Sequence, residues 1–232
     1  MNKRRSLSTT CLVIHVGTNH LTAALASSDK VGCALSWYEW HEATQIIHEG
    51  QLTDPSWCKQ KLAAVVEQLP YRATACVIML DGVCERWIAT PSWQHVPVHQ
   101  DYDERLFKVQ TTYIAPLVHD LFLHYVAAIP YPLLLSVQLL AISLRLNIVA
   151  ITTSTTALHY AYKLHQGRAF RAVTLAQELQ RTEGKLQTRF NAEHAARLIN
   201  THASCTLDYQ RDYPYVLPVV GAHTLFKEHY AY

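Results

Sequence analysis

Histidine is unusually frequent in this chain, with 14 among 232 residues. Imidazole is a common metal ligand and, near neutral pH, a general base. Metal sites also need a suitable spacing of ligands, and several histidine-containing segments do not have it. His95 and His99 flank the helix breaker Pro97, and His119 and His124 are five residues apart. The His-Glu pairs at 41–42 and 48–49 are not followed by the second histidine of an H-E-x-x-H motif. We therefore expect no metal site, and interpret the histidines as surface or core residues.

Nucleophilic and phosphate-binding signatures are also missing from the sequence. It contains no G-x-S-x-G motif, no P-loop and no known local Cys-His signature. Glycine occurs only 7 times, whereas loops that close on phosphate need it. One glycine turn, Gly17-Thr18-Asn19, lies between two apolar segments and fits either a plain hairpin or a phosphate loop. We expect no catalytic residue.

Charge, cysteine usage and hydropathy narrow the class of protein. Lys plus Arg total 20 and Asp plus Glu total 18, a net charge of +2, which argues against a nucleic-acid binder. The 6 cysteines have no C-x-x-C spacing, and no complete export signal follows the basic start, so we expect reduced thiols and a cytoplasmic protein. The uncharged stretch 121–144 is interrupted by Pro130 and Pro132 and is not expected to span a membrane.

The elements that must position these residues form an α/β pattern in the first ninety residues. Asp54 followed by Pro55 predicts a helix N-cap and first turn. The pattern predicts two strands within 12–26 joined at Gly17, a third strand at 32–40, a helix from Pro55 to about 69, and strands at 74–80 and 86–89.

The second half of the chain is expected to contain both helices and strands. The spacing of Leu106, Val109 and Gln110 predicts a helix over 101–113. Further predictions are a strand at 121–129, helices at 136–146 and 155–166, a strand at 148–152, a polar helix-prone stretch at 171–202 and a closing helix at 219–232.

Several of these segments, taken in order, resemble the actin-like type IV pilus assembly proteins (PilM and its HofM relatives). They are the turn, Asp and helix of 46–70, the strand, loop and Arg86-containing strand of 76–91, the helix-strand-helix passage of 139–158, and the closing Gly-Ala helix of 219–232. The resemblance implies an actin-like (ribonuclease H-like) α/β fold. It divides the chain into a first lobe at 1–91, an inserted α+β subdomain at 92–150 and a reduced second lobe at 151–232.

The same resemblance bears on nucleotide binding. The family's first phosphate loop has the form D-x-G-[ST], and here His15 occupies the place of the Asp while Gly17 and Thr18 remain. An imidazole supplies no negative charge for a magnesium-phosphate group. The family's later glycine-rich loops have no counterpart between Gln166 and Tyr215. We therefore expect neither ATP nor Mg²⁺ as a cofactor.

A protein partner is implied instead. In the family, the first lobe and the inserted subdomain form a groove for the cytoplasmic tail of a PilN-like inner-membrane protein. The resemblance thus predicts a non-catalytic adaptor of a type IV pilus or type II secretion-like platform, peripheral to the inner membrane. Partner-binding candidates are Arg86, Trp93, Phe107, Tyr113 and Tyr125. Two alternatives stay open, an actin-like switch that still binds ATP and an unrelated α/β enzyme with a histidine-based site.

Overall fold

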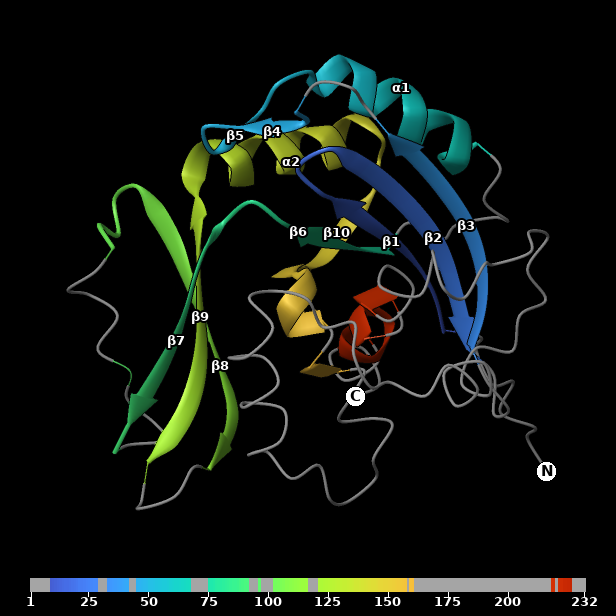
Figure 1. The fold of residues 1–232 in the computed structure, drawn as a ribbon. Coiled ribbons are helices and arrows are strands. Elements are labelled where there is room, and N and C mark those ends of the chain that lie inside the picture. Colours follow the sequence, from blue (N-terminus) through green and yellow to red (C-terminus); the bar gives the residue numbers. More distant parts are fainter. Residues whose placement is uncertain are drawn as a thin grey trace, which may run out of the picture.

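Two sheets of different size dominate the fold (Figure 1). The structure, a computed structural model, describes residues 9–28, 33–41, 45–67, 75–91, 96, 102–116, 121–157, 159–160, 218–219 and 221–226. The larger sheet has five strands in the order β10-β6-β1-β2-β3. Their bounds are β1 Thr9–Val16, β2 His20–Ser28, β3 Cys33–His41, β6 Ala75–Leu80 and β10 Asn147–Thr153.

The larger sheet is mixed in direction. β1, β2 and β3 are consecutive antiparallel strands, whereas β6 and β10 run parallel to β1. This confirms the two N-terminal strands joined at Gly17 and the third strand after them. The parallel arrangement brings the carboxyl ends of β1, β6 and β10 to the same edge of the sheet.

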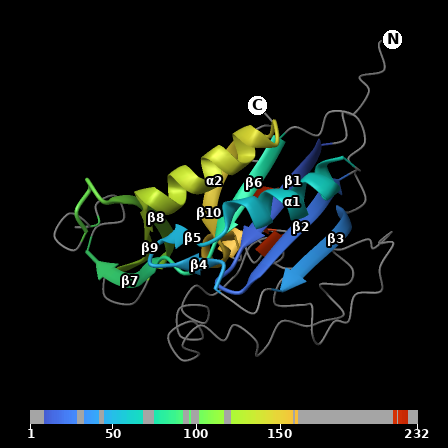
Figure 2. The ribbon, with the colours of Figure 1, turned by 90° about the horizontal axis from the view of Figure 1, so that it is seen from above.

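Both faces of the larger sheet are covered (Figure 2). Leu12, Ile14 and Val16 of β1 pack on one face with helices α1 (Pro55–Val66) and α2 (Tyr131–Ser143). The alternate residues Cys11 and Val13 pack on the other face with the helical residues 157, 219, 222 and 226. Burial on both faces explains the nearly continuous apolar run of β1 and β6, because neither side of these strands meets water.

Helix α1 begins where the sequence predicts. The Asp54 side chain accepts a hydrogen bond from the Trp57 backbone N–H at 2.9 Å, and Pro55 occupies the first turn. Before it, the short strands β4 (Ile47–His48) and β5 (Gln51–Leu52) form a hairpin. Its two turn residues, Glu49 and Gly50, both have positive φ (49° and 73°), which two-residue hairpin turns of type I′ require.

The smaller sheet has three strands in the order β7-β9-β8. They are β7 Cys84–Thr90, β8 Phe107–Pro116 and β9 Phe122–Pro130, all antiparallel to their neighbours. The strand pairing divides the chain differently from the predicted boundaries at 92 and 150. β7 belongs to the smaller sheet, whereas α2 and β10 belong to the larger sheet and its core.

The predicted helix over 101–113 is wrong, because residues 107–116 form strand β8 along β9. Its β-branched and aromatic residues Val109, Thr111, Thr112 and Tyr113 favour a strand, and pairing with β9 outweighs the helical spacing. The predicted strands at 121–129 and 148–152 are confirmed as β9 and β10, and the helix at 136–146 as α2, which begins earlier, at Tyr131.

Later predictions are tested only in part. Residues 154–157 and 221–226 are helical, in keeping with the predicted helices over 155–166 and 219–232. The predicted stretch at 171–202 lies outside the described residues. Cys11, Cys58 and Cys76 are buried and Cys84 is exposed, and none of these four described cysteines forms a disulfide.

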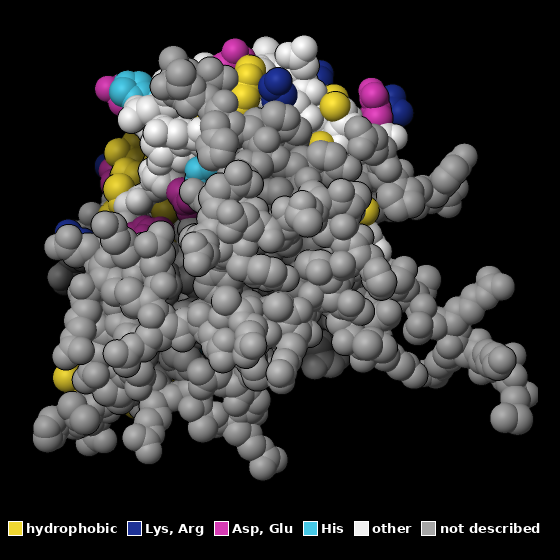
Figure 3. Space-filling model, turned by 45° about the vertical axis from the view of Figure 1, so that its right-hand side comes forward, with side chains coloured by type: hydrophobic (Ala, Val, Ile, Leu, Met, Phe, Trp, Pro, Cys, Tyr) yellow, Lys and Arg dark blue, Asp and Glu magenta, His cyan; other side chains and the backbone are white. Residues whose placement is uncertain are grey.

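The surface of α2 is apolar on its outer side as well as its inner side. Leu135, Leu139 and Ile142 are exposed, whereas Leu133 and Val137 pack in the core. Within the described ranges, no helix is both long enough and apolar enough to cross a bilayer. Figure 3 shows another view of the surface, where the described Lys and Arg side chains are interspersed with Asp and Glu side chains.

Candidate functional site at the edge of the larger sheet

Three polar side chains meet at the edge where the parallel strands end. His15 is the penultimate residue of β1, Asp81 follows β6, and Ser154 follows β10. Asp81 continues the β1–β6 pairing, because its backbone N–H donates to the Val16 carbonyl at 3.0 Å. Crevices at the carboxyl ends of parallel strands are the usual place for ligands in open α/β sheets.

His15 and Asp81 form a close contact at this edge. The His15 Nε2 and Asp81 Oδ2 atoms are 2.7 Å apart, and their side chains are 3% and 30% exposed. Ser154 Oγ donates to the other oxygen of Asp81. Burial alone would raise the pKa of Asp81, but His15, the Ser154 hydrogen bond and His20 together hold it below its ordinary value. The carboxylate is therefore ionised and accepts hydrogen bonds on both oxygens.

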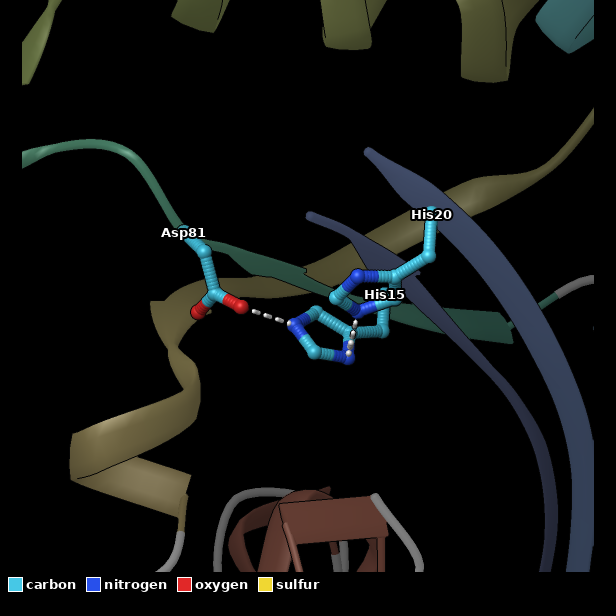
Figure 4. Close-up of side chains that lie close together, drawn as sticks. All are labelled: His15, His20 and Asp81. Carbon is cyan, nitrogen blue, oxygen red and sulfur yellow. Dashed lines mark hydrogen bonds and ion pairs between the residues drawn. The ribbon is translucent and has the colours of Figure 1, made fainter. Parts of the chain in front are cut away.

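A second histidine approaches His15 from the tight turn between β1 and β2. The turn is closed by the Gly17 N–H, which donates to the His20 carbonyl at 2.8 Å. His20 Nε2 lies 3.4 Å from His15 Nδ1, and the two rings meet edge to face with centroids 4.7 Å apart. Figure 4 shows His15 between Asp81 and His20, with one ring nitrogen toward each.

Gly17 has a steric role in this arrangement. A Cβ atom at position 17 would lie 2.1 Å from Cε1 of His20, a distance that no side chain could tolerate. Gly17 thus leaves room for the His20 ring above the turn. Thr18 connects the turn to the start of strand β4. Its carbonyl accepts hydrogen bonds from the Ile46 N–H at 2.6 Å and the Ile47 N–H at 3.4 Å.

The sequence prediction located part of this site. His15, Gly17 and Thr18 lie in the predicted turn region, but we expected no metal ligands there. The structure brings His15, His20 and Asp81 together so that one potential ligand atom from each lies within 4.8 Å of the other two. His20 and Asp81 were missed. The available signal is the dipeptide Asp81-Gly82, directly after the predicted strand at 74–80.

The predicted partner-binding residues do not form one group. Paired residues of antiparallel strands place their side chains on the same face. Arg86 pairs with Val126 of β9, Phe107 with Pro130 and Tyr113 with His124. These three β9 residues alternate along the strand, so Arg86, Phe107 and Tyr113 share one face of the smaller sheet. Tyr102 joins them there. The centroid of its ring lies 5.8 Å from the guanidinium carbon of Arg86 and 5.9 Å from the ring centroid of Phe107.

Tyr125 lies on the opposite face, and this corrects its assignment as a binding residue. Its side chain is fully buried, and its hydroxyl lies 3.0 Å from Thr153 Oγ1 at the end of β10. Burial, with the nearby Glu85 carboxylate, raises the pKa of Tyr125. Tyr125 is thus a core residue that joins the two sheets. Trp93 lies outside the described residues.

Two other side chains on this inner face reach the larger sheet. Gln110 Nε2 donates to the Ile151 carbonyl at 2.7 Å, and the Thr112 hydroxyl lies 3.4 Å from that of Thr156. The smaller sheet therefore turns one face toward β10 and the other face, with Arg86 and Tyr113, away from it.

No protein-family model matches the sequence, and no curated protein does. Solved structures do match. A chain of the PilM-PilN type IV pilus biogenesis complex has a TM-score of 0.52 and 16% identity, over 68% of this chain and 51% of that one. The cytoplasmic domain of EpsL, an inner-membrane component of the type II secretion system of Vibrio cholerae, has a TM-score of 0.42 and 6% identity, over 64% and 59%.

This chain spans about half the length of the PilM-PilN complex chain that it matches. At that identity the likeness concerns the fold. The resemblance to the PilM-like, actin-like proteins is thus confirmed at the level of the fold.

Proposed function

We propose that this protein is a non-catalytic adaptor of a type IV pilus or type II secretion-like platform, located in the cytoplasm at the inner membrane. It would bind the cytoplasmic tail of a PilN-like membrane protein. The main support is the fold shared with a chain of the PilM-PilN complex. The position of His15 supports the non-catalytic part, since an imidazole bonded to Asp81 takes the place of the loop carboxylate.

The outer face of the smaller sheet is the proposed binding surface. Arg86 and Tyr113 are exposed and Phe107 is half-buried, and all three lie on the face turned away from β10. The centre of that face is apolar, because it carries the buried residues Val126 and Ala128 of β9. Exposed aromatic and arginine side chains around an apolar centre suit the capture of an extended peptide.

Peptide binding can be measured directly. We expect a labelled peptide with the sequence of the cytoplasmic tail of a PilN-like membrane protein to bind in a fluorescence anisotropy titration. Tyr113→Ala and Arg86→Ala should each weaken binding about tenfold, as for interface anchors. Gln60→Ala, on the exposed side of α1, serves as the matched control and should bind like the unchanged chain. Equal affinity in all variants would reject this surface.

Nucleotide binding separates the adaptor from the ATP-dependent switch. A ligand at 100 times its Kd stabilises the native state by about 2.7 kcal/mol, which a thermal-shift assay detects. We expect no shift with Mg-ATP or Mg-ADP up to millimolar concentration. A magnesium-dependent shift that is lost on substitution of Thr18 would favour the switch.

A further inference from the structure

We propose that His15 and His20 form a binding site for a zinc-class transition-metal ion at the edge of the larger sheet, with Asp81 positioning His15. This site is independent of the proposed partner binding, because it lies at the β1–β2 turn and not on the outer face of the smaller sheet.

The spacing of the two imidazoles fits a shared metal. Zinc binds histidine nitrogen at about 2.0–2.1 Å in tetrahedral geometry, which places two nitrogen ligands about 3.4 Å apart. His20 Nε2 and His15 Nδ1 are 3.4 Å apart, which is long for a hydrogen bond between ring nitrogens. An ion beside this pair could contact both nitrogens with little movement of either ring.

Asp81 prepares His15 for this role. An ionised carboxylate only accepts hydrogen bonds, so the 2.7 Å contact requires the proton of His15 to be on Nε2. The lone pair of the neutral ring is then on Nδ1, the nitrogen that faces His20 (Figure 4). Carboxylates that hold the far nitrogen of a metal-binding histidine orient the ring and raise its basicity. Ser154 in turn orients Asp81.

The surroundings leave room for further ligands. His15 is buried, but His20 is only half-buried and Asp81 is 30% exposed. Water can therefore complete the coordination. Two imidazoles favour Zn²⁺, Co²⁺, Ni²⁺ or Cu²⁺, whereas Mg²⁺ prefers oxygen ligands. Mg²⁺ should not compete for the site.

Zinc binding to the purified full chain tests the proposal by isothermal titration calorimetry. His20→Phe keeps a ring above Gly17 and removes both nitrogens, and we expect at least tenfold weaker zinc binding at one site. The matched control is His48→Ala, an exposed histidine with 60% of its side chain accessible, which should leave zinc binding at this site unchanged. Excess Mg²⁺ should not displace the zinc.

A second variant keeps both histidines. Gly17→Ala forces the His20 ring to move, because the new Cβ would lie 2.1 Å from it, and we expect a similar loss of zinc affinity. Asp81→Asn should weaken binding about tenfold, in the range for lost positioning carboxylates. Circular dichroism melts without metal check that each variant is folded. The proposal is overturned if the unchanged chain binds no zinc, or if the His20→Phe and Gly17→Ala chains bind it as tightly as the unchanged chain.

Discussion

The two sheets bury their strands to different extents. In the larger sheet, β1 and β6 are buried on both faces, by α1 and α2 on one side and by helical residues near the C-terminus on the other. In the smaller sheet, the central strand β9 is buried at residues 123–129, whereas most of the edge strand β7 is exposed or half-buried. The larger sheet is thus suited to hold a fixed polar site at its edge. The smaller sheet offers side chains to a partner.

Core truncations should show the largest difference between the sheets. Ile78→Ala in β6 removes a side chain that is 2% exposed, and we expect a loss of about 2–5 kcal/mol in the free energy of unfolding. Ile88→Ala in the half-buried part of β7 should cost only about 1 kcal/mol. Urea unfolding of both variants measures the difference, and equal losses would contradict the comparison.

The contact between the sheets should contribute an intermediate amount. Tyr125→Phe removes the hydroxyl that lies 3.0 Å from Thr153 Oγ1 and keeps the ring, so we expect a loss of about 1 kcal/mol. Tyr113→Phe is the matched control on the outer face, and its change should stay within about 0.5 kcal/mol. Similar urea midpoints for the two variants would mean that the Tyr125 bond does not stabilise the junction.

The smallest change in stability is expected at Cys84, the exposed thiol of β7. Cys84→Ser should alter the free energy of unfolding by less than about 0.5 kcal/mol. In the native chain, a thiol reagent should label Cys84, while the buried Cys58 and Cys76, whose pKa values burial raises to about 11 and 12, should stay unlabelled. Peptide mass spectrometry assigns the labelled positions. Early labelling of Cys76 would show that the larger sheet opens readily.

Local patterns were sufficient where an element is defined by its own residues. The turn at Gly17, the Asp54 cap and the strands on either side were predictable because capping and alternation act over a few residues. The helix predicted over 101–113 was wrong because Leu106, Val109 and Gln110 fit a helical spacing by chance. The residues form a strand because they pair with β9, and the spacing of apolar residues within 101–113 does not reveal that pairing.

The site was only half predictable for a similar reason. His15 stood out beside the glycine turn, but its partner Asp81 lies 66 residues further along the chain. Their contact depends on the parallel pairing of β1 with β6, which a pattern within either strand does not specify. The two imidazoles meet for a different reason, because the tight turn between β1 and β2 brings His20 back to His15.

The way in which the chain crosses between the sheets has a mechanical consequence. It leaves the larger sheet after Leu80, through Gly82 with φ of 70°, and returns at Pro130. The two crossings are neighbours, because Cys84 pairs with Ala128. The contacts from Gln110 and Tyr125 to β10 are a second connection between the two sheets. Any displacement of the smaller sheet relative to the larger one would therefore have to break these contacts or bend the two crossings beside Asp81.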